Sequence, residues 1–292
     1  MAVRAFARFS PAVCVLGESP TWDSRRDGLW WVDIRGQSIF FADSAGCIRV
    51  QKAFDSAVAS LGLCRSGRVL VALAKSVILW DPQEDISWPL CEIESQMPEN
   101  RLNDGKVGPD GRFWVGSMHD SPRREPRGSL YRVDASGRVE KVLAGLCVSN
   151  GLAWTKDAGR MCLSDSAAAW IDRFDFDPRS GELRNRRRLA SLSESEGRPD
   201  GASFDQADIY WSAGVSAGCI NGINHTGRII ESWKTPVGSP TMCAFGGADA
   251  RKMFITSHAL SQAPQPEDGA LLVTDARSPG VLPFEFDDGA AA

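Results

Sequence analysis

The chain has 292 residues, of which 43% are hydrophobic and 24% are charged, and its formal net charge is −4. This composition is that of a globular protein with a sizeable core, and it argues against disorder. The net charge is negative and no membrane-length apolar run occurs, which argues against nucleic-acid and membrane partners. The N-terminal segment is interrupted by arginine and proline, unlike a secretory signal, so we expect a cytoplasmic protein.

Short apolar strands that follow turn-forming pairs recur along the whole chain. The strands read, in order, LWWVDI, RVLVAL, RFWVGS, RMCLSD, IYWSAG and RKMFITS. The pairs before them begin at residues 27, 66, 110, 158, 207 and 249, so the intervals run from 39 to 49 residues. A second alternating strand and turn follows in most units. Six such units predict an all-β fold, a six-bladed β-propeller that spans residues 1–292 as a single domain.

Polar residues recur at a matching place upstream of these turns. Four polar residues each stand seven positions before the residue that opens a turn, which is residue 110, 157, 207 or 248; in the same order, they are Asn103, Asn150, Asp200 and Thr241. In the first unit, Glu18 stands nine positions before residue 27. Innermost propeller strands start at one end of the central channel, so we expect these side chains to converge on its mouth. Carboxylate and amide oxygens there would suit a divalent cation. For any single residue, use in an ordinary Asn-Gly or Asp-Gly turn is the alternative.

At this point the chain resembles the SMP-30/gluconolactonase/regucalcin-like family from end to end. The segments that carry the resemblance are LGESPTWD (16–23), RLNDGKVGPDGRFWVGSMH (101–119), SNGLAW (149–154), FDFDPRSGEL (174–183), RPDGASFD (198–205) and SPTMCAFGG (239–247). The resemblance implies a six-bladed propeller with one divalent cation (Ca²⁺, Zn²⁺, Mn²⁺ or Fe²⁺) at the channel mouth. It also implies hydrolysis of a small-molecule sugar lactone to the aldonic acid.

By position, the resemblance implies that Glu18, Asn150 and Asp200 are the metal ligands and that Arg101 and Asn103 contact the substrate. One position departs from the family pattern: where regucalcin-like proteins have a glutamate, this chain reads His119-Asp120-Ser121. We expect Asp120 or His119 to replace that substrate contact, or the substrate to differ. Asp104 is interpreted as structural, because its neighbour already fills the ring position.

Lactone hydrolysis needs a polarised carbonyl and an activated water, which the cation would supply, with Asp200 as the catalytic general base. A serine nucleophile is not favoured, because the chain has no GxSxG elbow. A non-catalytic cation-binding protein stays open; it would need ligands but not the pair Arg101 and Asn103. A WD-type interaction propeller is weaker, because no Trp-Asp pair recurs in every unit.

The loop at 117–128 carries three arginines, Arg123, Arg124 and Arg127. They form either a solvated rim or a lid that favours anionic lactones. We expect a monomer or a weak homo-oligomer.

Overall fold

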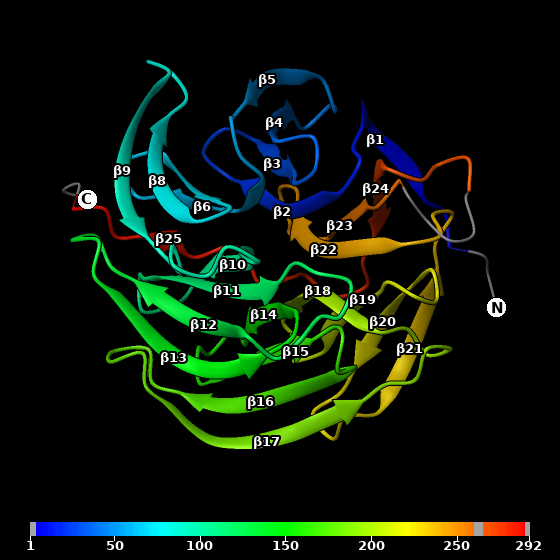
Figure 1. The fold of residues 1–292 in the computed structure, drawn as a ribbon. Helices are drawn as coiled ribbons and strands as arrows, with labels where there is room; N and C mark the ends of the chain where they lie inside the picture. Colours follow the sequence, from blue (N-terminus) through cyan, green and yellow to red (C-terminus); the bar gives the residue numbers. More distant parts are fainter. Residues whose placement is uncertain (1–3, 260–264, 290–292) are drawn as a thin grey trace.

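Six β-sheets are arranged around a central channel in the computed structural model, which describes residues 4–259 and 265–289 (Figure 1). Each sheet contains four antiparallel strands, ordered from the innermost strand at the channel to the outermost strand at the outer edge of the blade. Each innermost strand contacts the innermost strands of both neighbouring blades, which closes the ring. The all-β, six-bladed prediction is therefore confirmed, and the predicted strands lie where the repeated turns placed them.

The blades follow one another along the chain. Blade one contains β2 (Gly17–Asp23), β3 (Gly28–Asp33), β4 (Ser38–Asp43) and β5 (Ile48–Ala53), and blade two contains β6 (Val58–Cys64), β7 (Val69–Leu73), β8 (Ser76–Asp81) and β9 (Ile86–Glu92). Blade three contains β10 (Asn100–Val107), β11 (Phe113–His119), β12 (Gly128–Val133) and β13 (Val139–Leu146), and blade four contains β14 (Ser149–Trp154), β15 (Arg160–Asp165), β16 (Trp170–Phe176) and β17 (Leu183–Ser191). Blade five contains β18 (Pro199–Phe204), β19 (Tyr210–Gly214), β20 (Cys219–Ile223) and β21 (Ile229–Lys234), and blade six contains β22 (Pro240–Gly246), β23 (Lys252–Ser257) and β24 (Ala270–Asp275).

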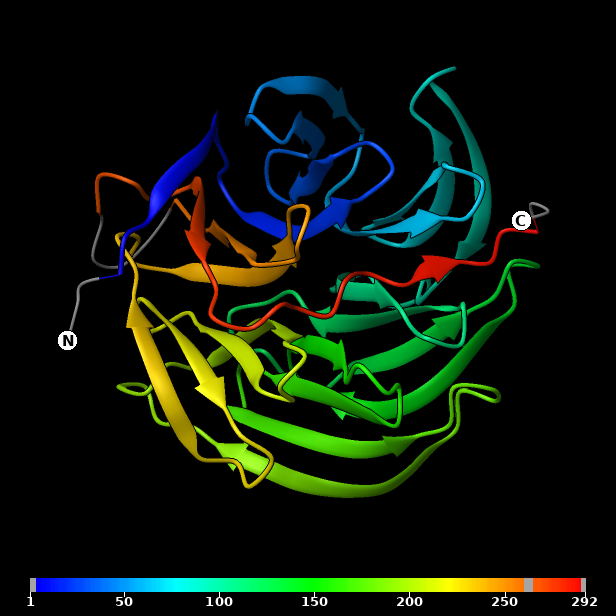
Figure 2. The ribbon, with the colours of Figure 1, turned by 180° about the vertical axis from the view of Figure 1, so that it is seen from behind.

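The two ends of the chain complete blades that are distant in sequence. The N-terminal strand β1 (Ala7–Val13) pairs with β24 and forms the outermost strand of blade six. Near the C-terminus, β25 (Glu285–Phe286) pairs in parallel with β6 of blade two. The segment between β24 and β25 crosses the side of the channel seen from behind (Figure 2). Strands near both ends of the sequence therefore pair with strands of the ring.

Burial decreases from the channel toward the rim of each blade. The second strands are buried on both faces, as in β3, where all six residues are buried. This explains why their sequences read as near-continuous apolar runs. The outermost strands are more polar, and β17, with the sequence LRNRRRLAS, exposes most of its residues. Such charged edges discourage pairing with a second molecule.

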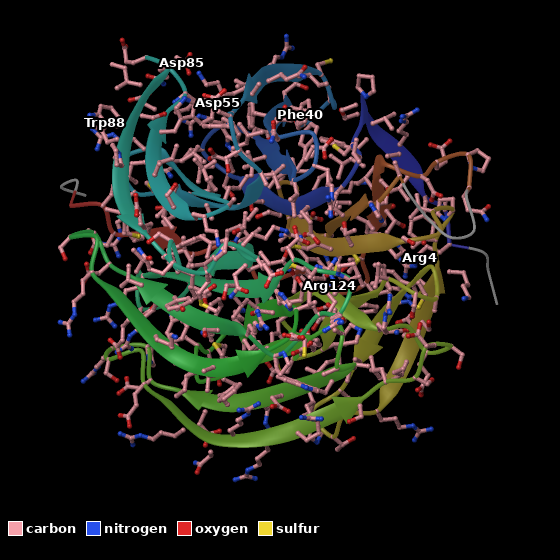
Figure 3. The ribbon with its side chains drawn as sticks, viewed as in Figure 1. Arg4, Phe40, Asp55, Asp85, Trp88 and Arg124 are labelled. Carbon is pink, nitrogen blue, oxygen red and sulfur yellow. The ribbon has the colours of Figure 1, made fainter. Side chains whose placement is uncertain are left out.

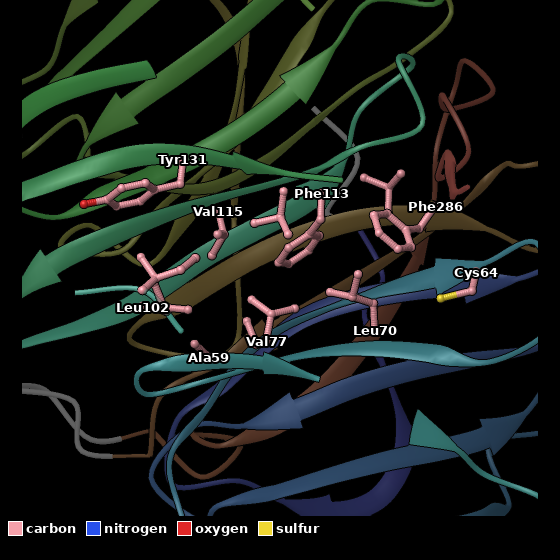
Figure 4. Close-up of a cluster of buried hydrophobic side chains, with 13 residues drawn as sticks. Ala59, Cys64, Leu70, Val77, Leu102, Phe113, Val115, Tyr131 and Phe286 are labelled. Atoms are coloured by element: carbon pink, nitrogen blue, oxygen red, sulfur yellow. The ribbon is translucent and has the colours of Figure 1, made fainter. Parts of the chain in front are cut away.

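The hydrophobic core consists of clusters that lie between neighbouring blades. Between blades two and three, Leu70 and Val77 pack against Phe113 and Val115, and Phe286 completes the cluster (Figure 4). Equivalent clusters fill each of the other blade interfaces. Packing between blades thus fixes the positions of the innermost strands, on which the candidate site depends.

The cysteines form no disulfide in the described residues, as expected for free thiols. Five of the eight are buried and Cys47 is exposed. Among the described residues, no helix is long and apolar enough to cross a membrane.

Candidate metal and substrate site

A register irregularity interrupts every innermost strand near the start of the strand. In β2 it lies between Glu18 and Thr21, and in β10 between Leu102 and Gly105. The same break occurs in β6, β14, β18 and β22, so it is a property of the repeat. A bulge redirects a side chain away from the alternation of a regular strand. The predicted polar residues lie at these breaks, which turn them toward the channel.

Five of the predicted site residues line one cavity of about 230 Å³ at this end of the channel: Glu18, Arg101, Asn103, Asn150 and Asp200. A water molecule needs about 10–15 Å³ on the same measure, so the cavity admits a ligand much larger than a cation. Thr241 also lines this cavity, and its hydroxyl donates to Gly17 O of blade one. The repeated spacing therefore identified residues that the fold does bring together.

The floor of the cavity is a group of four buried charged side chains. Glu18 and Asp200 line the cavity, whereas Asp104 and Lys106 do not line it but act on the pKa of these carboxyl groups. Burial, followed by the carboxylates of Asp200 and Asp104, raises the pKa of Glu18 well above its usual range. Burial and the Asp104 carboxylate raise the pKa of Asp200 to about 8. Burial also lowers the pKa of the Lys106 amine, against the attraction of Asp104. Positive side chains oppose these shifts, Lys106 at Glu18 and the guanidinium groups of Arg198 and Arg101 at Asp200.

The amide side chains are held in fixed orientations. Asn150 Nδ2 donates to Ser166 Oγ at 2.8 Å, which turns Asn150 Oδ1 toward Asn103. Asn103 Nδ2 donates to Ser149 O at 3.0 Å and to Asn150 Oδ1 at 3.2 Å. Arg101 Nη1 in turn donates to Asn103 Oδ1 at 2.7 Å. This chain of hydrogen bonds preorganises the amide oxygen beside the carboxylates.

His119 and Asp120 do not line the cavity. Asp120 lies behind Arg101, and its Oδ2 accepts a hydrogen bond from Arg101 Nε at 3.1 Å. His119 is buried at the end of β11, and its Nδ1 accepts the backbone N–H of Glu125 at 3.0 Å. The structure thus places Asp120 against an arginine that lines the cavity and His119 at the base of the 117–128 loop.

Sequence reasoning missed two members of the floor, Asp104 and Lys106. Asp104 was interpreted as structural, and its Oδ2 does accept the Leu152 N–H at 2.9 Å. Its carboxylate nevertheless acts on both Glu18 and Asp200. Alternation along a strand could have linked residues 104 and 106, because positions two apart share a face. Their approach to blades one and five could not be read from any local pattern.

The donor set suits a hard divalent cation. Asp104 Oδ1 is buried without a hydrogen-bond partner among the described residues. Glu18, Asp200 and Asn150 offer two carboxylates and an amide oxygen, the ligand types that such cations prefer. Within residues 4–259 and 265–289, no cluster of three or more His, Cys, Asp or Glu side chains is arranged to hold a metal. The fit therefore depends on the amide oxygen of Asn150 in addition to the carboxylates of Glu18 and Asp200.

Lys106 separates the polar cavity from an apolar cavity of about 60 Å³ at the other ends of the innermost strands. Its Nζ donates to Ala202 O.

We expect Lys106→Met to lower the free energy of unfolding by about 3 kcal/mol, because the substitution leaves the buried carboxylates without the positive charge of the lysine. Urea denaturation at neutral pH measures this, with Lys156→Met on the exposed surface as the control. Equal stability of both variants would contradict the electrostatic role.

Comparisons with known proteins identify relatives of the whole chain. The family model described as the SMP-30/gluconolactonase/LRE-like region matches residues 16–259. Regucalcin of Gallus gallus is 32% identical over 283 residues, which cover 93% of this chain and 94% of the relative. The 6-deoxy-6-sulfogluconolactonase of Pseudomonas putida is 33% identical over 272 residues, which cover 91% and 93%.

Among solved structures, a calcium-binding regucalcin of Agrobacterium tumefaciens superposes with a TM-score of 0.90 at 23% identity, covering 98% of this chain and 99% of that one. A gluconolactonase of Xanthomonas campestris gives a TM-score of 0.75 at 20% identity, covering 94% and 89%. At these identities the two structures support the propeller fold. The match of the family model over most of the sequence shows that the chain belongs to the SMP-30/gluconolactonase/LRE-like family.

Proposed function

We propose that the protein is a metal-dependent sugar lactonase that hydrolyses an aldonolactone to the aldonic acid. The observation that carries the proposal is the pairing of two kinds of group in one cavity. The carboxyl groups of Glu18 and Asp200, which suit a divalent cation, line the same cavity as the hydrogen-bonding side chains of Arg101 and Asn103. A sugar lactone needs both kinds of group: a cation acts on its carbonyl, and hydrogen-bonding side chains hold its hydroxyl groups.

In this proposal Glu18, Asn150 and Asp200 hold the cation. When bound, the cation supplies Lewis-acid activation of the lactone carbonyl and lowers the pKa of water beside it. The Asp200 carboxylate accepts the proton of the attacking water. Arg101 and Asn103 orient the sugar hydroxyls, and the Arg101 guanidinium offsets negative charge that develops on the carbonyl oxygen.

Asp120 and His119 take supporting positions in this scheme. Asp120 orients the guanidinium of Arg101 through their 3.1 Å hydrogen bond. Because Asp120 also accepts from Arg124 at 2.8 Å, it links Arg101 to the 117–128 loop. His119 fixes the base of that loop through the Glu125 N–H.

Relatives support the activity without settling it. One relative over 30% identical is named as a lactonase acting on 6-deoxy-6-sulfogluconolactone. Others at similar identity are named regucalcin, and they favour a second candidate, a cation-binding protein without catalysis. Arg101 and Asn103 favour the first candidate, because a cation-binding protein has no need of substrate-holding groups.

A pH-indicator assay separates the two candidates. We expect acid release from at least one lactone of an aldonolactone panel, abolished by chelation and restored by Ca²⁺, Zn²⁺, Mn²⁺ or Fe²⁺. Each cation is added alone, so that the assay also ranks them. Cation-dependent stabilisation without hydrolysis of any lactone would favour the binding protein. Hydrolysis that chelation leaves unchanged would overturn the role of the cation.

A further inference from the structure

Arginines gather at the rim of the cavity around one carboxylate. Asp120 Oδ1 lies 2.8 Å from Arg124 Nη1 and 3.9 Å from Arg35 Nη2, and its Oδ2 lies 3.1 Å from Arg101 Nε. Although burial acts in the opposite direction, these guanidinium groups lower the pKa of Asp120. Asp120 is therefore ionised, and three arginines around a single carboxylate leave two positive charges in excess at the rim.

Of the three arginines in the 117–128 loop, one faces the cavity. Arg124 lines it, whereas the Arg123 side chain is 85% exposed and Arg127 is bound to Glu99 and Glu125. Figure 3 shows Arg124 near the centre of the channel face. Its φ of 48° lies in the left-handed region, where a side chain is strained. The loop thus adopts a costly conformation at the residue that it directs over the cavity.

The guanidinium of Arg124 retains unused donors. Within the described residues it donates through Nη1 alone, to His119 O and Asp120. The carboxylates of the neighbouring loop, Glu99 and Glu125, are occupied by Arg127. Among the residues that the structure describes, no second carboxylate is paired with Arg124, so its remaining N–H groups can receive an anion from the cavity.

We propose that the site selects lactones that carry an acidic group on the carbon farthest from the carbonyl, and that Arg124 recognises that group. The inference rests on the proposed lactonase function, which places the carbonyl at the floor beside Glu18 and Asp200. A monosaccharide then extends its other end toward the rim. A carboxylate, sulfonate or phosphate at that end can accept two parallel hydrogen bonds from the planar guanidinium of Arg124.

Matched lactones test the selectivity. D-Glucono-1,4-lactone and D-glucaro-1,4-lactone differ by a terminal hydroxymethyl and a carboxylate, and 6-deoxy-6-sulfogluconolactone adds the sulfonate. We expect kcat/KM to be higher for the acidic lactones, and the ratio of acidic to neutral to fall with added salt. The two acidic substrates show which anion the rim prefers.

Arg124→Gln is expected to lower that acidic-to-neutral ratio by about tenfold to a hundredfold, the range for a hydrogen bond to a charged group. Arg124→Lys keeps the charge without the fork, so the ratio should fall less. The matched control is Arg123→Gln in the same loop, which should leave the ratio unchanged. Thermal melting of all three variants confirms that they are folded.

The outcomes are distinguishable. Hydrolysis of neutral lactones at least as fast as of acidic ones, with a ratio that Arg124→Gln leaves unchanged, overturns this inference and leaves the lactonase proposal standing. Absence of hydrolysis with every lactone and cation overturns the proposed function and this inference with it. An equal fall of the ratio in Arg123→Gln would show that loop charge in general, and not Arg124, is responsible.

Discussion

Asp200→Asn is expected to lower kcat/KM for the preferred lactone by about 10²–10⁴-fold, the usual contribution of a general base. The amide keeps an oxygen that can face the cation but cannot accept a proton at neutral pH. The variant should therefore still be stabilised by the divalent cation. Asp200→Ala removes both functions and should lose cation-dependent stabilisation as well as activity.

Asp200→Asn should also raise the stability of the metal-free protein at alkaline pH. Ionised Asp200 lies buried near Glu18 and Asp104, and the neutral amide removes part of that repulsion. Thermal melting of the chelated variant at pH 9 measures this gain. Glu140→Gln, on a half-exposed rim side chain, is the control that should leave rate and stability unchanged. Full activity of Asp200→Asn would exclude Asp200 as the base.

Cation binding is expected to stabilise the protein more at pH 9 than at pH 6. Burial raises the pKa of Asp200 to about 8, whereas an unfolded aspartate has a pKa near 4. The folded, metal-free protein therefore binds more protons between these values, and its stability falls as pH rises through this window. A cation must displace those protons, so its affinity should rise by about tenfold per pH unit for each proton displaced.

Thermal melting of the chelated protein, with and without excess cation at each pH, measures this effect. At a thousandfold excess over the dissociation constant, binding adds about 4 kcal/mol to the free energy of unfolding. Glu18→Gln, which removes one proposed ligand, should reduce the shift at pH 9 sharply. A cation-dependent shift that is equal at both pH values would contradict the placement of the cation among carboxylates of raised pKa.

Much of the fold could be predicted because each blade repeats its own local signals. Turn pairs such as Asp110-Gly111 precede buried apolar strands, and the Asp110 carboxylate accepts the Trp114 indole N–H at 3.0 Å. A similar Asp–Trp contact, Asp205 with Trp211 at 3.0 Å, recurs in blade five. Repetition at a near-constant interval turned these weak signals into a six-bladed prediction.

The site was predictable where it follows the repeat and unpredictable where it does not. Asn150 and Asp200 share an offset of seven residues and Glu18 stands at the equivalent place with an offset of nine, so their convergence on one cavity followed from the symmetry of the blades. Lys106 and Arg124 have no such offset. Lys106 meets blade five through the hydrogen bond from its Nζ to Ala202 O, and Arg124 lines the cavity from a loop in which its own φ is 48°. Such placements depend on tertiary packing and not on a sequence period.

The closure of blade six by β1 has a consequence for how the protein is made. The partner of this N-terminal strand is β24, which is synthesised after blades one to five. Until then blade six lacks its outermost strand, and β2 lacks its neighbour β22 across the ring. Glu18 and Thr241 meet at the channel only once that gap closes. If the proposed cation site forms, a nascent chain would complete it only after blade six has been synthesised, which would make cation uptake a marker of ring closure.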